Sequence, residues 1–142
     1  MRILPELEAF ECIISLGTRN EGFADQFSAF SNVRAESWLA RDLGSLYRSA
    51  DIIISRGSIT TLAEAAAFGA KIIAIPLPIA AFDHQRANVR AYEALGYAQG
   101  LEETELSRLK ELILSNSGRR IYTEPRYDIL AGVRRISEQL LR

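Results

Sequence analysis

The chain has very few of the residues on which disulfide-bonded and metal-binding proteins depend. Its 142 residues include one cysteine, Cys12, and one histidine, His84. A lone cysteine cannot form a disulfide within the chain, and the apolar run around Cys12 is typical of a buried strand. A lone histidine with no cysteine nearby is a poor basis for a zinc site. We therefore expect a reducing compartment, no bound metal and no cofactor.

Long apolar runs and a strong net charge are also lacking. The formal net charge is −1, so the chain as a whole does not offer a surface for nucleic acid. No apolar run approaches the length needed to cross a bilayer, and no signal peptide is evident. With 48% hydrophobic and 25% charged residues, the composition is that of a globular protein. These features predict a single cytoplasmic domain, residues 1–142, with no direct membrane insertion.

Short apolar segments alternate with amphipathic ones along the chain. Strands separated by helices of this length form a parallel sheet with helices on both faces, so the order predicts a Rossmann-like α/β fold. The spacing of Phe23, Phe27 and Phe30 predicts that these rings lie in the core. The expected strands cover residues 12–17, 32–35, 51–55, 71–75 and 97–100. The expected helices cover residues 41–50, 60–68, 84–95, 103–116 and about 126–141.

The predicted order of elements begins with the end of a helix, residues 3–10, rather than with a strand. A doubly wound sheet normally opens with a strand and a glycine-rich turn, and that strand lies in the middle of the sheet. We therefore expect either that Met1–Leu4 serves as this strand or that the sheet lacks its first strand. In the second case the open edges would need to be closed by a partner, by a second copy of the chain or by an exchanged strand.

The segment from Asp51 to Gly69 is the most informative part of the sequence. A buried strand is followed by the polar loop Ser55-Arg56-Gly57-Ser58 and then by a helix of small residues. Gly57 permits a tight turn or a close backbone approach, Ser58 and Thr60 offer hydroxyls, and Arg56 offers a cation for a diphosphate. The alternative is that Ser58 is only a helix cap and Arg56 only a solvated side chain.

Glu64 has two possible roles that the local sequence leaves open. Thr61-Leu62-Ala63-Glu64 fits a capping box in which Thr61 is the N-cap, and local sequence favours this reading. If the helix begins at Ser58 instead, Glu64 projects beside the cleft. A carboxylate there can accept hydrogen bonds from two neighbouring hydroxyls, as acidic residues that hold a ribose do.

A second polar cluster follows the strand at 71–75. Gln85 and Asn88 are spaced about one helical turn apart near the start of a helix, and His84 is adjacent. Paired amides suit sugar hydroxyls, which both donate and accept hydrogen bonds. Asp83 as an N-cap explains part of the cluster but not His84, Gln85 and Asn88 together.

These residues resemble a known family. The stretch SRGSITTLAEAAAFGAKIIAIPLP, followed by FDHQRAN and EALGYA, is similar to the C-terminal, donor-binding half of GT-B glycosyltransferases of family 28, in particular the MurG type. The resemblance covers roughly residues 3–116. It implies that Ser58–Thr61 meets the diphosphate of a UDP-sugar, that Glu64 holds the ribose, and that His84, Gln85 and Asn88 lie near the donor sugar. It also implies that Leu39, in the segment Trp38–Leu43, lies where the backbone reads the uracil.

The chain departs from the family pattern in three ways. Ser58 stands where members usually have a further glycine, the first strand with its Gly-Gly-Ser turn is lacking, and so is the acceptor-binding N-terminal half. No Asp-x-Asp motif occurs, which agrees with metal-independent chemistry. We expect no catalytic residue in this chain, and we expect peripheral contact with the inner face of the membrane only through the missing half.

The resemblance implies a function and two alternatives. The chain would bind UDP-N-acetylglucosamine as the donor half of an enzyme that transfers N-acetylglucosamine to a lipid-linked peptidoglycan precursor, and it would be inactive alone. One alternative is a donor-site subunit that works with a separate acceptor subunit. The other is a non-catalytic nucleotide-binding or interaction module.

Overall fold

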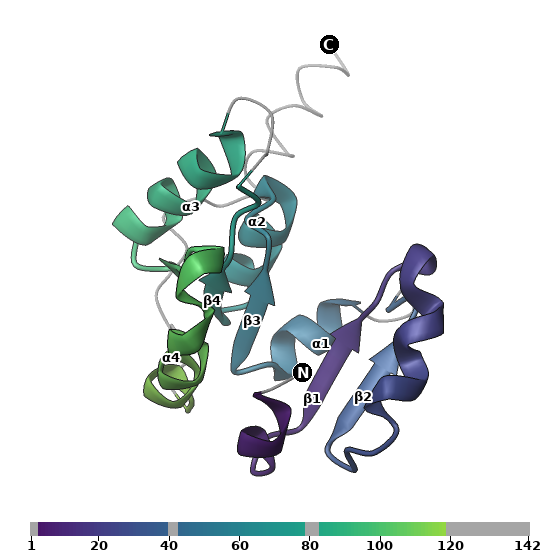
Figure 1. The fold of residues 1–142 in the computed structure, drawn as a ribbon. Helices are drawn as coiled ribbons and strands as arrows, with labels where there is room; N and C mark the ends of the chain where they lie inside the picture. The colour runs from purple at the N-terminus through teal and green to yellow at the C-terminus, as the bar shows by residue number, and fades with distance from the viewer. Residues whose placement is uncertain (1–2, 40–42, 79–82, 119–142) are drawn as a thin grey trace. The chain divides into compact units, whose positions relative to one another are not determined.

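The computed structural model describes residues 3–39, 43–78 and 83–118. The chain divides into two compact units, Met1–Leu43 and Gly44–Arg142, each of which is described by itself (Figure 1). The prediction of a single domain over residues 1–142 therefore stays a prediction. The helix expected at about 126–141 lies outside the described residues.

The first unit contains a pair of parallel strands. β1 (Cys12–Ser15) pairs with β2 (Val33–Glu36), with Cys12 opposite Val33. A short 3-10 helix, η1 (Leu4–Leu7), precedes β1 and buries Leu4 and Leu7. Asn32, just before β2, links this strand to η1 and to the residues that follow η1. Its amide Nδ2 donates to the carbonyl oxygens of both Leu7 and Phe10 at 2.9 Å.

The expected burial of three phenylalanines in this unit is wrong. The segment between the strands forms the 3-10 helix η2 (Thr18–Phe27), and Phe23 is 51% exposed while Phe27 and Phe30 are half-buried. A 3-10 helix has three residues per turn, so side chains four positions apart diverge by about a third of a turn. Phe23 and Phe27 thus cannot share the apolar face that an α-helix would have given them.

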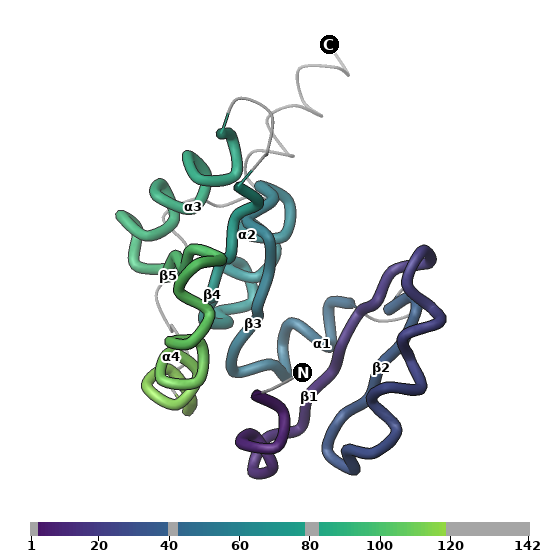
Figure 2. The backbone as a smooth tube through the Cα atoms, viewed as in Figure 1, coloured from purple at the N-terminus to yellow at the C-terminus, as the bar shows by residue number. Residues whose placement is uncertain are grey.

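The second unit is built around a three-stranded parallel sheet in the order β3-β4-β5. β3 (Ile52–Ser55) leads through α2 (Ile59–Ala67) to β4 (Lys71–Ala74), and the chain reaches β5 (Ala98–Gly100) through α3 (His84–Ala94), as Figure 2 shows. The register places Ile53 opposite Ile72, and Ile73 opposite Gln99.

Three further helices flank this sheet along the chain. α1 (Leu43–Ser49) precedes β3, while the 3-10 helix η4 (Glu103–Arg108) and α4 (Leu109–Asn116) follow β5. The helix expected at 103–116 is therefore divided at Arg108. A capping box between Glu102 and Glu105 starts η4, and Glu105 itself has non-helical backbone angles.

The strands confirm the predicted α/β class with parallel pairing. Among the described residues they form two sheets rather than one, with β1 paired to β2 and β3 paired to β4. The expected lack of a central first strand stays a prediction. β3 is thus an edge strand of its described sheet, although its three consecutive isoleucines are typical of a central strand.

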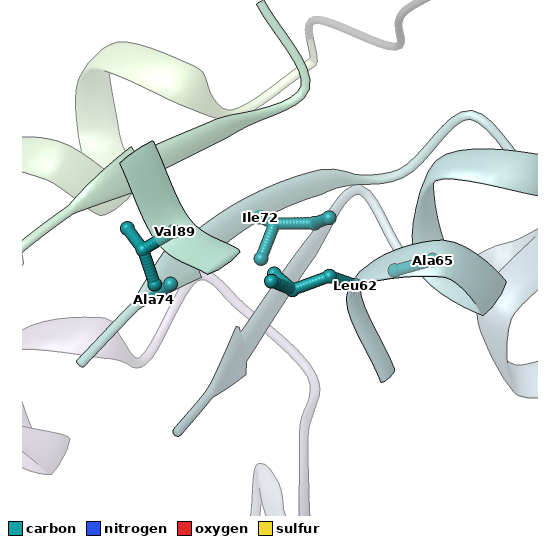
Figure 3. Close-up of a cluster of buried hydrophobic side chains, with 5 residues drawn as sticks. All are labelled: Leu62, Ala65, Ile72, Ala74 and Val89. Atoms are coloured by element: carbon teal, nitrogen blue, oxygen red, sulfur yellow. The ribbon is translucent and has the colours of Figure 1, made fainter. Parts of the chain in front are cut away.

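The core of the second unit lies between the sheet and two helices. Leu62 and Ala65 of α2, Ile72 and Ala74 of β4, and Val89 of α3 form one buried cluster (Figure 3). Ile73 and Ile75, which alternate with these β4 positions, are also buried, and α4 packs against β4. β4 is therefore covered on both faces, which explains its uninterrupted apolar sequence.

An arginine fork joins the start of α3 to the loop after β5. The Nε and Nη2 atoms of Arg86 donate to the two carboxylate oxygens of Glu102 at 2.9 and 2.8 Å, and Nη1 lies 3.2 Å from Oδ1 of Asp83. This bidentate pair lowers the pKa of Glu102 and raises that of Arg86. Because it links residues 16 positions apart, the fork holds α3 against the chain that leaves the sheet.

Replacing Leu62 by alanine should destabilise the second unit by about 2–5 kcal/mol, since the side chain is fully buried and its loss leaves a cavity. Chemical denaturation measures the change. Ile59→Ala is the matched control in the same helix, because Ile59 is 53% exposed, and it should change stability by about 0.5 kcal/mol or less. Equal losses in both variants would contradict the assigned core.

The Arg86–Glu102 pair should make stability depend on acidity. Because folding lowers the pKa of Glu102, its contribution is complete above the ordinary glutamate pKa of about 4.3 and is lost as the pH falls through the lowered value. The melting temperature of Glu102→Gln should therefore lie below that of the native chain at neutral pH, and the gap should close in acid. Glu111→Gln, at an exposed position on α4, is the control. A gap that is independent of pH would contradict this account.

Candidate functional site

The loop after β3 lies against helix α3. Gly57 is buried and has a φ of +81°, which side-chain-bearing residues rarely adopt. A Cβ atom at this position would lie 2.7 Å from Cγ2 of Val89 and 3.4 Å from the carbonyl oxygen of Gln85. The close backbone approach predicted for Gly57 is therefore present, and both the φ angle and the neighbouring atoms require a glycine.

Helix α2 begins directly after this loop. Ser58 is its N-cap, and the Ser58 hydroxyl accepts a hydrogen bond from the backbone N–H of Thr61 at 3.3 Å. The capping box expected at Thr61 and Glu64 is therefore wrong, because Ser58 already starts the helix three residues earlier. Glu64 instead lies in the second turn with its side chain exposed. A helix that begins at Ser58 was the condition under which the sequence predicted Glu64 as a ligand-binding residue.

Hydroxyl groups gather at the start of α2. Oγ of Ser58 lies 3.2 Å from Oγ1 of Thr60 and donates to Oγ1 of Thr61 at 3.0 Å. The first N–H groups of an α-helix have no acceptor within the helix, and the helix dipole favours negative charge beside them. Together with the loop, this end of α2 can accept an anionic oxygen-rich group such as a phosphate.

Two amide side chains connect α3 to the ends of two strands. Nδ2 of Asn88 donates to the carbonyl oxygen of Gly57 at 3.3 Å, after β3, and Oε1 of Gln85 accepts from the backbone N–H of Leu77 at 2.8 Å, after β4. The sequence predicted these amides as a sugar-binding pair. Each uses one of its two polar groups in the bond described here, so the amides also fix the two loops.

Three other predicted site residues have different surroundings. The guanidinium of Arg56 forms an ion pair with the carboxylate of Glu103, which follows β5. His84 is exposed at the first position of α3. Leu39 is half-buried and belongs to the first unit, whereas the other eight predicted residues belong to the second.

Sequence reasoning missed the surroundings of Glu64. The ring of Tyr47, in α1, packs against that of Phe68 at the end of α2, with ring centroids 6.1 Å apart. Partial burial and the negative charge of nearby Glu64 raise the pKa of Tyr47. The helical spacing in α1 predicts that Tyr47 faces inward, but nothing in the local sequence links it to a residue 17 positions later.

The N-cap of α3 also differs from expectation. Asp83 has a left-handed backbone, with a φ of 54°, and its side chain makes no capping hydrogen bond. Its carboxylate lies instead beside Arg86. The role of Asp83 is therefore to complete the arginine fork.

A cavity of about 170 Å³ lies elsewhere in the second unit. It is lined by α3 and the chain after β5, including Arg86, Arg90, Glu93, Glu102 and Glu105. None of the nine predicted site residues lines it, and two of its five charged residues, Arg86 and Glu102, belong to the arginine fork. It is therefore distinct from the site at the start of α2.

Metal and membrane sites were also sought in the part of the chain that the structure describes. No group of three or more histidine, cysteine, aspartate or glutamate side chains there could hold a metal ion. Within the same residues, no helix is both long enough and apolar enough to span a bilayer.

Solved structures share this fold. The MurG crystal structure from Acinetobacter baumannii superimposes with a TM-score of 0.62 and 24% identity, over 80% of this chain and 35% of that one. The glycotransferase of kitacinnamycin gives a TM-score of 0.67 at 16% identity, over 82% of this chain and 30% of that one. At these identities the likeness is one of fold.

The curated relatives described here are named for the same activity. The UDP-N-acetylglucosamine–N-acetylmuramyl-(pentapeptide) pyrophosphoryl-undecaprenol N-acetylglucosamine transferase of Desulfotalea psychrophila is 33% identical over 77% of this chain. The enzyme of the same name from Thermotoga maritima is 32% identical over 77%. The chain matches only 30% and 31% of these two relatives' lengths. A model of the glycosyltransferase family 28 C-terminal domain matches residues 6–140, and the protein therefore belongs to that family.

Proposed function

We propose that this chain binds UDP-N-acetylglucosamine and supplies the donor site of a glycosyltransferase that acts on a lipid-linked peptidoglycan precursor. The observation that carries the proposal is the position of Glu64. Ser58 caps α2, so the Glu64 carboxylate is not needed at the helix start and stands exposed in the next turn. The family and the activity named for its relatives give the ligand class.

Each part of the donor has a suitable group in the second unit. The N-terminus of α2 and the Ser58 and Thr60 hydroxyls suit the diphosphate, which needs N–H and O–H donors. The Glu64 carboxylate suits the two ribose hydroxyls, which need acceptors. Gln85 and Asn88 stand beside the Gly57 loop and suit the sugar hydroxyls, with His84 at the same end of α3.

Arg56 has a further role in this proposal. Its ion pair with Glu103 holds the guanidinium next to the loop that precedes α2. Both side chains are substantially exposed, and such pairs are weak. A diphosphate can therefore replace Glu103 as the partner of Arg56, which would bring the cation to the donor when it binds.

Transfer itself needs more than this chain supplies. The acceptor hydroxyl must be positioned opposite the departing UDP and must lose its proton. We assign no residue of this chain to that step, and the chain corresponds to less than a third of the relatives' length. We therefore propose that an acceptor-binding domain or subunit completes the site. It would also hold the chain at the inner face of the membrane, in the cytoplasm.

Glu64→Ala should weaken binding of UDP-N-acetylglucosamine by about tenfold or more, since two hydrogen bonds to a charged acceptor are lost. Isothermal titration calorimetry of both forms measures the difference. Glu111→Ala, at an exposed position on α4, is the matched control and should bind like the native chain. If the native chain does not bind at millimolar ligand, the proposed donor site is wrong.

The isolated chain should show no transfer of N-acetylglucosamine to a lipid-linked acceptor, because nothing positions or deprotonates the acceptor hydroxyl. A radiolabelled-donor assay with and without a family 28 acceptor-binding domain tests this. Robust turnover by this polypeptide alone would overturn the proposed need for a second domain or subunit.

A further inference from the structure

The ion pair between Arg56 and Glu103 joins two segments that follow strands on opposite sides of β4. Arg56 comes directly after β3 and Glu103 comes shortly after β5, while the strand order is β3-β4-β5. The ends of the three strands are level with one another. The N–H of Ile75 donates to the carbonyl of Ser55 at 2.7 Å, and the N–H of Leu101 donates to that of Ala74 at 2.9 Å. The pair therefore bridges the carboxyl edge of the sheet, where open α/β sheets bind their ligands.

The backbone on both sides of this ion pair is held in place, whereas the two side chains are exposed. Gly57, which follows the arginine, is buried against α3. Glu102, which precedes the glutamate, is bound by the bidentate contact with Arg86. The paired side chains themselves are 43% and 38% exposed. The pair can therefore open by a movement of side chains alone, with water replacing the lost partner.

The ion pair occupies the cation that the proposed function assigns to the diphosphate. A guanidinium presents its N–H groups as a planar fork, which matches the geometry of carboxylates and of phosphates. The Glu103 carboxylate and a diphosphate therefore compete for Arg56. A bound diphosphate would also lie near the displaced carboxylate, and two negative charges repel each other. Both effects oppose binding of the donor.

We propose that Glu103 is an internal competitor of the donor, which lowers the affinity of the site for a nucleoside diphosphate by pairing with Arg56. This inference rests on the proposed function, in which the diphosphate takes Arg56 as its partner. Exposed ion pairs are weak, so the competition changes the affinity by about threefold and does not block the site. Because Glu103 pairs with Arg56 again as the diphosphate departs, it favours release of the nucleoside diphosphate that transfer leaves behind.

Glu103→Gln tests this proposal, with the affinity for UDP measured by isothermal titration calorimetry at low ionic strength, where exposed charges are screened least. The variant removes the competing charge and keeps the size of the side chain, so it should bind UDP about threefold more tightly than the native chain. Glu111→Gln is the matched control, because it removes the same charge at an exposed position on α4. It should bind UDP like the native chain.

A double-mutant cycle with Arg56→Gln shows whether Glu103 acts through the arginine. Arg56→Gln alone should weaken UDP binding by about fivefold, since a charge-assisted contact with the diphosphate is lost. When Glu103→Gln is added to this variant, the affinity should rise by clearly less than threefold, because no cation is left to release. An equal gain with and without Arg56, or no gain in the native background, would overturn the proposed competition.

The same titrations separate this proposal from the proposed function. If Glu64→Ala weakens UDP binding and Arg56→Gln leaves it unchanged, the diphosphate does not take Arg56. The competition is then wrong, while the donor site still stands. If the native chain does not bind UDP at millimolar concentration, the proposed function itself fails, and the role of Glu103 fails with it. Both substituted side chains are exposed, so neither variant disturbs the buried core.

Discussion

The close contact between the Gly57 loop and α3 fixes the arrangement on which the candidate site depends. Val89 fills the space where a side chain at residue 57 would stand, and Val89 also belongs to the buried cluster beneath α2 and α3. The position of the loop therefore depends on the core. The same core sets the distance between α2 and α3. The start of α2 lies close to α3 because Gly57 lets the backbone that leads into α2 approach Gln85 and Val89.

Polar side chains of α3 also fix the segments that follow the strands of the sheet. Asn88 holds the carbonyl of Gly57, Gln85 holds the N–H of Leu77, and the Arg86 fork holds the chain after β5. These three side chains come from two adjacent turns of α3 but reach segments that follow three different strands. α3 thus organises the carboxyl edge of the sheet, where open α/β sheets bind their ligands.

The sequence predicted the strands well, because isoleucine runs bounded by glycine and polar residues have few other structures. It also predicted that Gly57 allows a close approach. It failed at Glu64, where local spacing favoured a capping box, since a Ser three residues earlier competed for the same helix start. Phe23 was misplaced because the local pattern does not distinguish a 3-10 helix from an α-helix.

Two contacts could not be predicted from local patterns at all. The ring of Tyr47 in α1 packs against that of Phe68 at the end of α2, and Arg56 pairs with Glu103, 47 residues away. Both depend on how elements pack, and packing is decided by the whole core rather than by neighbours in the sequence.

The strand order of the second unit has a consequence for how the chain folds. Each strand pairs with its neighbour in the sequence, so Ile52 meets Lys71 and Ile72 meets Ala98 without any strand inserted between them later. Such short sequence separations keep the entropy of loop closure low and favour fast folding. The residues that form the candidate site on α2 and α3 lie within this stretch. Their scaffold can therefore assemble strand by strand as the polypeptide is synthesised.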